Sequence, residues 1–197
     1  MRFLTQIYRA NPVVLTILFF LLLAALELLR KRYGSSWRWS AAMSACTVGM
    51  LLAILYTTVF GRAVGAETGV HLTPFDSYRQ YFAGENNEFL RANFMNALLF
   101  APFGMFLFSA LPRKWNPAVK LILITLVGCG VSCGVEYLQF IRGCGEVEAD
   151  DVIHNTLGML IGGAGLLIVR YIFRDDGYLY PKLCKLFRHI KEKIQER

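Results

Sequence analysis

Five long apolar blocks follow one another along the chain, separated by segments that carry most of the charges. A helix that crosses the hydrocarbon core of a membrane needs about 17 to 25 mostly apolar residues. Polar and apolar residues do not alternate with a period of two inside the blocks, so we expect helices and not the strands of a barrel. The pattern predicts an all-α membrane protein, a bundle of five transmembrane helices at residues 13–29, 39–60, 93–111, 121–141 and 152–169.

The two ends of the chain extend this picture. Asn11-Pro12 favours a helix start and the basic run 30–32 follows the first block, so we expect that block to be retained as a helix and not removed as a signal peptide. We assign residues 1–173 to a transmembrane domain and residues 174–197 to a basic tail. Apolar residues form one helical stripe in the tail, which predicts an amphipathic C-terminal helix on the inner leaflet, with a solvated tail as the alternative.

Composition agrees with a membrane protein and argues against two other classes. Of the 197 residues 55% are hydrophobic and 18% are charged, and the formal net charge is +7. A disordered chain would have far fewer apolar residues. A nucleic-acid-binding domain would spread its basic residues over a folded surface, whereas here they lie between the apolar blocks. We therefore expect membrane lipids as partners, and no nucleic acid.

The distribution of basic residues predicts how the chain crosses the membrane. With five spans, 15 of the 21 Lys and Arg residues fall on one side and 6 on the other. The side with more basic residues is expected to face the cytoplasm. We predict a multi-pass protein of the cell membrane, with its N-terminus outside and its C-terminus in the cytoplasm.

The sequence contains none of the standard catalytic and metal-binding signatures. It has no phosphate-binding loop, nucleophile elbow, zinc-protease motif or CxxC pair. Cys129 and Cys133 lack partners for a metal site, so we interpret them as small packing residues, and we expect no metal or cofactor. Glycines in the fourth and fifth helices predict that these two helices approach closely, and they are Gly128, Gly130, Gly134, Gly158, Gly162, Gly163 and Gly165. Gly158 and Gly162 also have the spacing typical of such contacts.

Polar residues gather at the predicted outer ends of the last three helices. They are Asn93, Asn96, Glu136, Gln139, Asp150, Asp151 and Asn155. A carboxylate below the membrane surface is costly to bury and needs a partner, which Arg62, Arg91 or Arg142 can supply. Two interpretations stay open: the polar side chains line an outward-facing binding pocket, or they only hydrogen-bond the helices to one another.

The loop before the third block carries a second signal. Thr73 precedes Pro74, which disfavours helix at Thr73 and starts a new segment. Phe75, Tyr78 and Phe82 then follow at helical spacing. We predict a short amphipathic helix on the outer surface, which covers the pocket or anchors the loop.

Four short segments occur in order between about residues 50 and 170. They are YTTVFGR at 56–62, LTPF at 72–75, NFMNALLFAPFG at 93–104, and EYLQ at 136–139 followed by DDVIHNTLG at 150–158. Their ordered combination resembles the VanZ-like family of integral membrane proteins. The resemblance implies a protein of the bacterial cell envelope with a link to low-level teicoplanin resistance.

Three functions are compatible with these residues. The first is a non-catalytic envelope protein that binds a lipid, a lipid-linked cell-wall precursor or a lipoglycopeptide, and so lowers susceptibility to teicoplanin. The second is a membrane enzyme acting on a lipid-linked envelope substrate, with Glu136 and Asp151 as acid and base. The third is a small transporter, which would normally show repeated halves. We favour the first because the sequence offers no nucleophile or metal set.

Overall fold

The structure is a computed structural model that describes residues 11–34, 36–65, 69–84 and 88–173. Within these ranges five helical segments are long and apolar enough to span a membrane. They are α2 (Pro12–Tyr33), α3 (Trp37–Leu55) with the π-helical turn η1 (Tyr56–Phe60), α5 (Glu88–Ala110), α6 (Pro117–Arg142) and α7 (Ala149–Ile172). The predicted all-α bundle is confirmed, and the predicted C-terminal helix lies outside the described residues.

Helix ends are set by polar capping residues that flank the apolar blocks. Asn11 caps α2 by accepting the backbone N–H of Val13, and Asn116 caps α6 by accepting that of Ala118. A proline follows each cap, at a position where its missing N–H costs no helical hydrogen bond. Gly143 ends α6 with a φ of 57°, a left-handed conformation that glycine adopts without strain. The helices therefore extend beyond the stretches that hydropathy alone marks.

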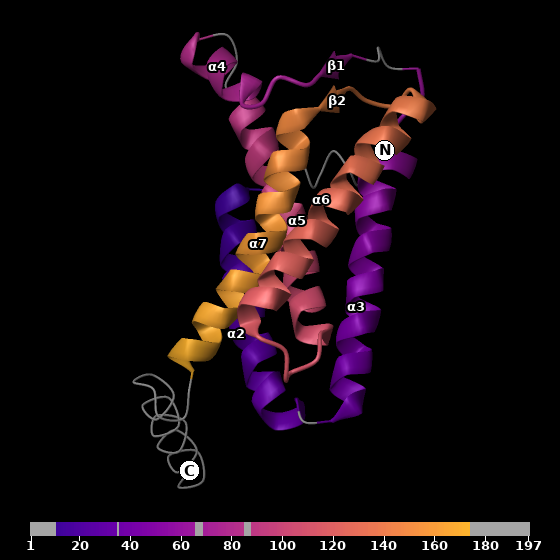
Figure 1. Ribbon diagram of the computed structural model, residues 1–197. Helices are drawn as coiled ribbons and strands as arrows, with labels where there is room; N and C mark the ends of the chain where they lie inside the picture. The colour runs from indigo at the N-terminus through magenta and orange to yellow at the C-terminus, as the bar shows by residue number, and fades with distance from the viewer. Residues whose placement is uncertain (1–10, 35, 66–68, 85–87, 174–197) are drawn as a thin grey trace, which may run out of the picture.

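Two opposite ends of the bundle differ in structure (Figure 1). One end, here called the cap end, carries α4 (Asp76–Phe82) and the strands β1 (Val70–His71) and β2 (Val147–Glu148). The other holds the α2–α3 and α5–α6 connections and the last turn of α7. The two strands pair in parallel, with Val70 opposite Val147 and His71 opposite Glu148. The short helix was predicted from the sequence, but the strand pair was not.

The expected close approach of the fourth and fifth spans occurs, since a Cβ on Gly128 would lie 2.4 Å from the Met159 side chain, but Gly158 and Gly162 face a different helix. A Cβ atom added to Gly158 would lie 2.2 Å from the carbonyl oxygen of Ala97, and one on Gly162 would lie 1.9 Å from that of Ala101. Both glycines thus let α7 pack directly on the backbone of α5, the third span, and not on the fourth. Gly163 serves the fourth span, because a Cβ there would meet the Ile124 side chain at 2.3 Å.

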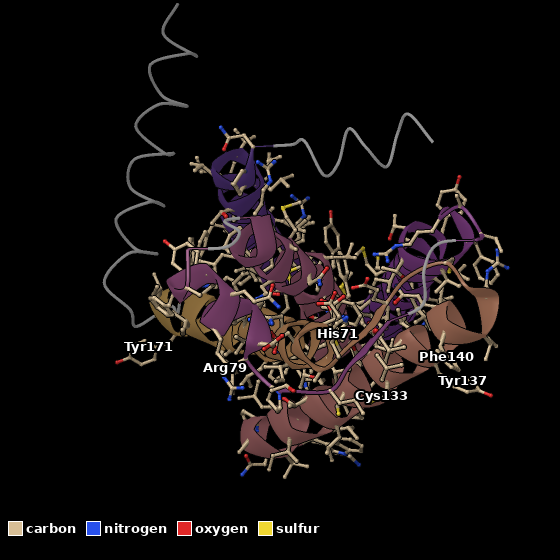
Figure 2. The ribbon with its side chains drawn as sticks, turned by 90° about the horizontal axis from the view of Figure 1, so that it is seen from above. His71, Arg79, Cys133, Tyr137, Phe140 and Tyr171 are labelled. Carbon is tan, nitrogen blue, oxygen red and sulfur yellow. The ribbon has the colours of Figure 1, made fainter. Side chains whose placement is uncertain are left out.

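The interpretation of Cys133 as a packing residue is wrong. Its side chain is exposed on α6, on the side of the helix that also carries Tyr137 and Phe140 (Figure 2). Tyr137 and Phe140 are 64% and 48% exposed. In a membrane this face of α6 contacts lipid, where apolar side chains are favoured.

Candidate functional site

The carboxylate of Asp150, in the first turn of α7, caps the N-terminus of α4. Its Oδ2 accepts the backbone N–H of Ser77 at 2.9 Å and also the Ser77 hydroxyl, while Oδ1 accepts the backbone N–H of Phe75. Phe75 occupies the N-cap position of α4 with a φ of 60° and provides no side-chain cap. Asp150 therefore supplies the acceptor that the helix start lacks. Asn93 of α5 joins this group by donating to the Ser77 hydroxyl at 2.8 Å.

His154, one turn further along α7, holds α4 through Tyr78. The His154 Nδ1 lies 2.6 Å from the Asp150 carbonyl oxygen, and its Nε2 lies 2.8 Å from the Tyr78 hydroxyl. A carbonyl oxygen only accepts, so Nδ1 carries a proton and donates to it, while Nε2 hydrogen-bonds to the Tyr78 hydroxyl. The two rings also stack at a centroid distance of 5.7 Å. Both ring nitrogens are therefore engaged in fixing the short helix.

A polar layer below this cap joins α5, α6 and α7. Asn96 donates to Asp151 Oδ1 at 2.7 Å, and Asn155 donates to the Ser132 hydroxyl at 2.9 Å. Glu136 Oε2 accepts the backbone N–H of Glu148 at 3.1 Å. Gln139 reaches out of this layer and donates to the Thr58 carbonyl oxygen of η1 at 3.0 Å. Within the part of the chain that the structure describes, three buried acceptors of the layer have no hydrogen-bond partner, and they are Glu136 Oε1, Gln139 Oε1 and Asn155 Oδ1.

Of the three cations predicted as possible partners of the acidic residues, Arg62 lies where its charge acts on them, and Arg142 turns elsewhere. The charge of Arg62 acts on both Glu136 and Asp151. Its Nη1 lies 2.8 Å from where a Cβ on Gly145 would stand, so Gly145 leaves room for the guanidinium. Arg142 instead lies over the ring of Phe60, 5.2 Å from its centroid. None of the described residues accepts a hydrogen bond from the buried Arg142 Nε.

Glu148 is the last residue of β2 and directly precedes α7, outside the membrane-spanning segments. The pKa of Glu148 is raised to about 7, first by burial and then by the charges of Asp151 and Glu146, against a lowering effect of His71. Carboxyl groups in such an environment hold a proton near neutral pH. The cap end thus carries a group whose charge changes in the physiological range.

A cavity of about 690 Å³ opens beside this polar layer, between α2, α3 and α5. Its polar or small lining residues come from η1, the loop after it, the cap-end part of α5 and the loop after α6, and they are Thr57, Thr58, Gly61, Arg62, Ala63, Asn96 and Cys144. The remaining lining residues are apolar, namely Leu15, Leu18, Phe19, Leu22, Met50, Met95, Leu98, Leu99 and Pro102. Arg62 and Asn96 belong both to the cavity wall and to the surroundings of Asp151. The cavity therefore has a mostly apolar wall and borders the polar layer where Arg62 and Asn96 line it.

Comparison with known proteins identifies the family. The VanZ/LLP1 family model matches residues 47–171. The chain belongs to the VanZ/LLP1 family. Every residue predicted from sequence as part of the site lies within the matched segment, whereas α2, which supplies one wall of the cavity, lies before it. Neither the curated proteins nor the solved structures provide a match.

Within the VanZ segment, the predicted site residues separate into two groups. Asn93, Asp150 and Phe75 form the α4 cap, through the backbone in the case of Phe75. The side chains of Thr73 and Pro74 are exposed in the turn before α4. The second group comprises the members of the polar layer with Arg62, and they are Asn96, Glu136, Gln139, Asp151 and Asn155. Arg142 belongs to neither.

Several residues of the VanZ site were not singled out from the sequence as site residues. Ser77 and Ser132 are hydroxyl partners whose residue type carries no signal by itself. Thr57 and Thr58 lie in η1, and each hydroxyl donates to the Ile54 carbonyl oxygen. A π-helical turn of this kind occurs frequently at functional sites. The chain was expected to be a plain helix there, because hydropathy does not distinguish the two forms.

Proposed function

We propose that this VanZ protein holds the hydrocarbon chain of an envelope lipid in the cavity between α2, α3 and α5. The phosphate-bearing or otherwise anionic head group then binds at Arg62 and Asn96. The observation that supports this proposal is the composition of the cavity wall, which is apolar along α2 and α5 and polar only near η1. An extended hydrocarbon chain fits along the apolar wall. The guanidinium near η1 can recognise an anionic oxygen group.

Such binding connects to the resistance implied by the family. A lipoglycopeptide such as teicoplanin carries an acyl chain, and its targets are lipid-linked wall precursors. Occupancy of the cavity by either molecule lowers susceptibility by keeping drug and target apart. A catalytic role receives less support, because neither Glu136 nor Asp151 is among the described residues that line the cavity. A general acid or base must reach the reacting atoms.

Two matched substitutions on α2 test the proposal. Leu18 lines the cavity and Leu21 does not, and their side chains are similarly exposed at 54% and 60%. Leu18→Trp fills the channel, so we expect it to abolish crosslinking of a photoactivatable phospholipid to the chain and to lower the teicoplanin inhibitory concentration in a deletion strain. Leu21→Trp places the same ring outside the cavity, so lipid crosslinking and the teicoplanin inhibitory concentration should stay unchanged.

A second pair of substitutions tests whether the head group binds at Arg62. Arg62→Gln removes the guanidinium from the cavity, while Arg79→Gln removes an exposed one from α4 at the same end of the bundle. We expect weaker lipid crosslinking for Arg62→Gln only. Vancomycin susceptibility is measured beside teicoplanin susceptibility in both strains.

Equal crosslinking and equal susceptibility in Leu18→Trp and Leu21→Trp strains, at equal membrane levels, would disprove the lipid-binding cavity.

A further inference from the structure

Two pairs of polar residues face one another where α6 and α7 pack together in the polar layer. Ser132 and Glu136 are four residues apart on α6 and share a face of that helix. Asp151 and Asn155 are likewise four residues apart on α7, which runs back from the cap end (Figure 1). Asn155 donates to the Ser132 hydroxyl at 2.9 Å. One turn closer to the cap end, Asp151 therefore lies on the side of Glu136, and its charge acts on that residue.

Each of these two carboxyl groups has one hydrogen-bond donor among the described residues. Asn96 of α5 donates to Asp151 Oδ1 at 2.7 Å, and the backbone N–H of Glu148 donates to Glu136 Oε2 at 3.1 Å. Glu136 Oε1 is buried and has no partner in the part of the chain that the structure describes. Nor does a hydrogen bond between described residues join Glu136 to Asp151. Two acceptor groups thus meet here without a donor between them.

Two amide oxygens next to Glu136 are in the same situation. Gln139 lies one turn further along the same face of α6, and Asn155 lies one turn from Asp151 on α7. Gln139 Oε1 and Asn155 Oδ1 accept no hydrogen bond from any described residue. The side chains of Glu136, Gln139 and Asn155 belong to residues that are only 3%, 2% and 4% exposed. Buried acceptors without a partner are costly in free energy, so these oxygens call for a bound donor or cation.

The chemistry of this oxygen set favours a metal cation over a proton. A proton on Glu136 occupies one oxygen and donates to one acceptor, so it leaves at least one of the two amide oxygens without a partner. A hard metal cation takes several carboxylate and carbonyl oxygens at once. The charge of Arg62 acts on both Glu136 and Asp151. One further positive charge therefore matches the two carboxylates, which favours a monovalent ion.

We propose that the polar layer between α6 and α7 binds a monovalent alkali cation through oxygens of Glu136, Gln139, Asp151 and Asn155. The described residues include no group of three His, Cys, Asp or Glu side chains that could hold a metal ion, and such a group is what a transition metal would need. Standard motifs do not reveal the site, because half of its ligands are amides. None of the four residues lines the cavity, so the site does not depend on the lipid binding proposed above.

Binding of radioactive Na⁺ to the purified full chain in detergent tests the site. We expect saturable binding that unlabelled Na⁺ displaces. Glu136→Gln keeps the shape of the side chain and removes its charge. It should weaken binding by more than about tenfold, because even changes in groups that only support metal ligands cost about 10- to 100-fold in affinity. Glu146→Gln removes a carboxylate at the same end that is 50% exposed and lies near His71, and it should leave Na⁺ binding unchanged.

Substitutions of Asn155 distinguish a cation ligand from a residue that only joins the two helices. Asn155→Asp keeps an oxygen at this position and should keep Na⁺ binding, whereas Asn155→Ala removes the oxygen and should weaken it. Both substitutions remove the amide N–H that donates to Ser132. Loss of that hydrogen bond alone would therefore affect both variants alike. Melting curves in choline chloride establish that the compared variants are folded.

The melting temperature provides a second measurement. It should be higher in sodium chloride than in choline chloride at equal ionic strength and pH, because a ligand that binds the folded state stabilises it. This difference should vanish in Glu136→Gln, whatever the stability of that variant in choline chloride. The proposal would be overturned if the folded unchanged chain bound no Na⁺ and its melting temperature depended on pH but not on Na⁺, as for a shared proton. Displacement of labelled Na⁺ by Ca²⁺ at far lower concentrations than by Na⁺ would also overturn it, in favour of a divalent ion.

Discussion

Asp150 belongs to the first turn of one helix and caps the start of another. The positive ends of two helix dipoles, those of α7 and α4, therefore meet at one carboxylate. Its three acceptor contacts involve the backbone and hydroxyl of Ser77 and the backbone of Phe75. Backbone N–H groups and a hydroxyl thus stabilise this carboxylate, which explains how Asp150 is buried at the cap end while Arg62 lies beside the polar layer.

Glu148 gives the cap end a dependence on pH. The folded-state pKa of Glu148, about 7, lies above the ordinary value of 4.5, so the folded state binds its proton more tightly than the unfolded state does. The stabilising contribution of the protonated group is complete below about pH 4.5 and is lost as the pH rises through 7. We predict that the melting temperature falls over this range, and that Glu148→Gln removes part of the fall.

The comparison of the two melting curves isolates the glutamate. Asp151, Glu146, Asp150 and His71 also face Glu148, and they remain in both proteins. The difference between wild type and Glu148→Gln should therefore be small near pH 4.5 and grow toward pH 8. A difference that stays constant over this range would show that the charge of Glu148 does not affect folding.

At the residue scale, the sequence predicted which residues gather but not how they pair. Depth in the membrane follows from position along each helix, and that placed Glu136, Asp151 and Asn155 at the same end. Pairing depends on the rotation of each helix about its axis, which packing sets. Asn155 thus bonds to Ser132 of α6, and Arg142, although near in sequence, turns toward Phe60.

At the scale of helices, the contact between α5 and α7 depends on glycines of α7, which have no Cβ atom. A Cβ on Gly162 would stand 1.9 Å from the Ala101 carbonyl oxygen, so Gly162→Ala must push the two backbones apart. We predict a loss of about 1 to 3 kcal/mol in the free energy of unfolding, the usual cost of overpacking. Gly130→Ala, which adds a methyl group where nothing lies within 4 Å, should stabilise slightly.

Reversible unfolding in mixed micelles measures both variants. If Gly162→Ala is as stable as wild type, the direct backbone contact does not contribute as the geometry requires.

The spacing of Gly158 and Gly162 predicted a close contact correctly and its partner wrongly, because spacing describes one helix surface only. The strand pair escaped prediction for a different reason: at two residues each, β1 and β2 are too short to show a period.

At the scale of the whole molecule, the bundle has one end rich in carboxylates and one rich in cations. Hydropathy was sufficient for the five spans, because the length of each apolar block reports directly on the thickness of the membrane. It could not reveal the cavity, which depends on how α2 lies against α5. Nor could it reveal that Glu27, the one charge in the first block, joins α2 to α7 through Arg170.

The orientation of these two ends across the membrane is the last prediction. Cys144 is a poor reporter for it, because this side chain is buried and its thiol donates to the Val59 and Gln139 carbonyl oxygens. Exposed positions serve better, and Arg79 of α4 and Lys114 of the α5–α6 connection mark opposite ends. In a background without native cysteines, an impermeant thiol reagent should label Arg79→Cys in intact cells.

Lys114→Cys should react only after the cells are permeabilised. The reason is the charge distribution, with 15 basic residues on the side that contains Lys114 and 6 on the other. The cysteine-free chain gives the background labelling, and the permeabilised sample shows that each introduced thiol is reactive. Labelling of Lys114→Cys in intact cells would place the end with the α5–α6 connection outside. The cavity near Arg62 would then open toward the cytoplasm, where a lipoglycopeptide acting at the cell surface does not meet it.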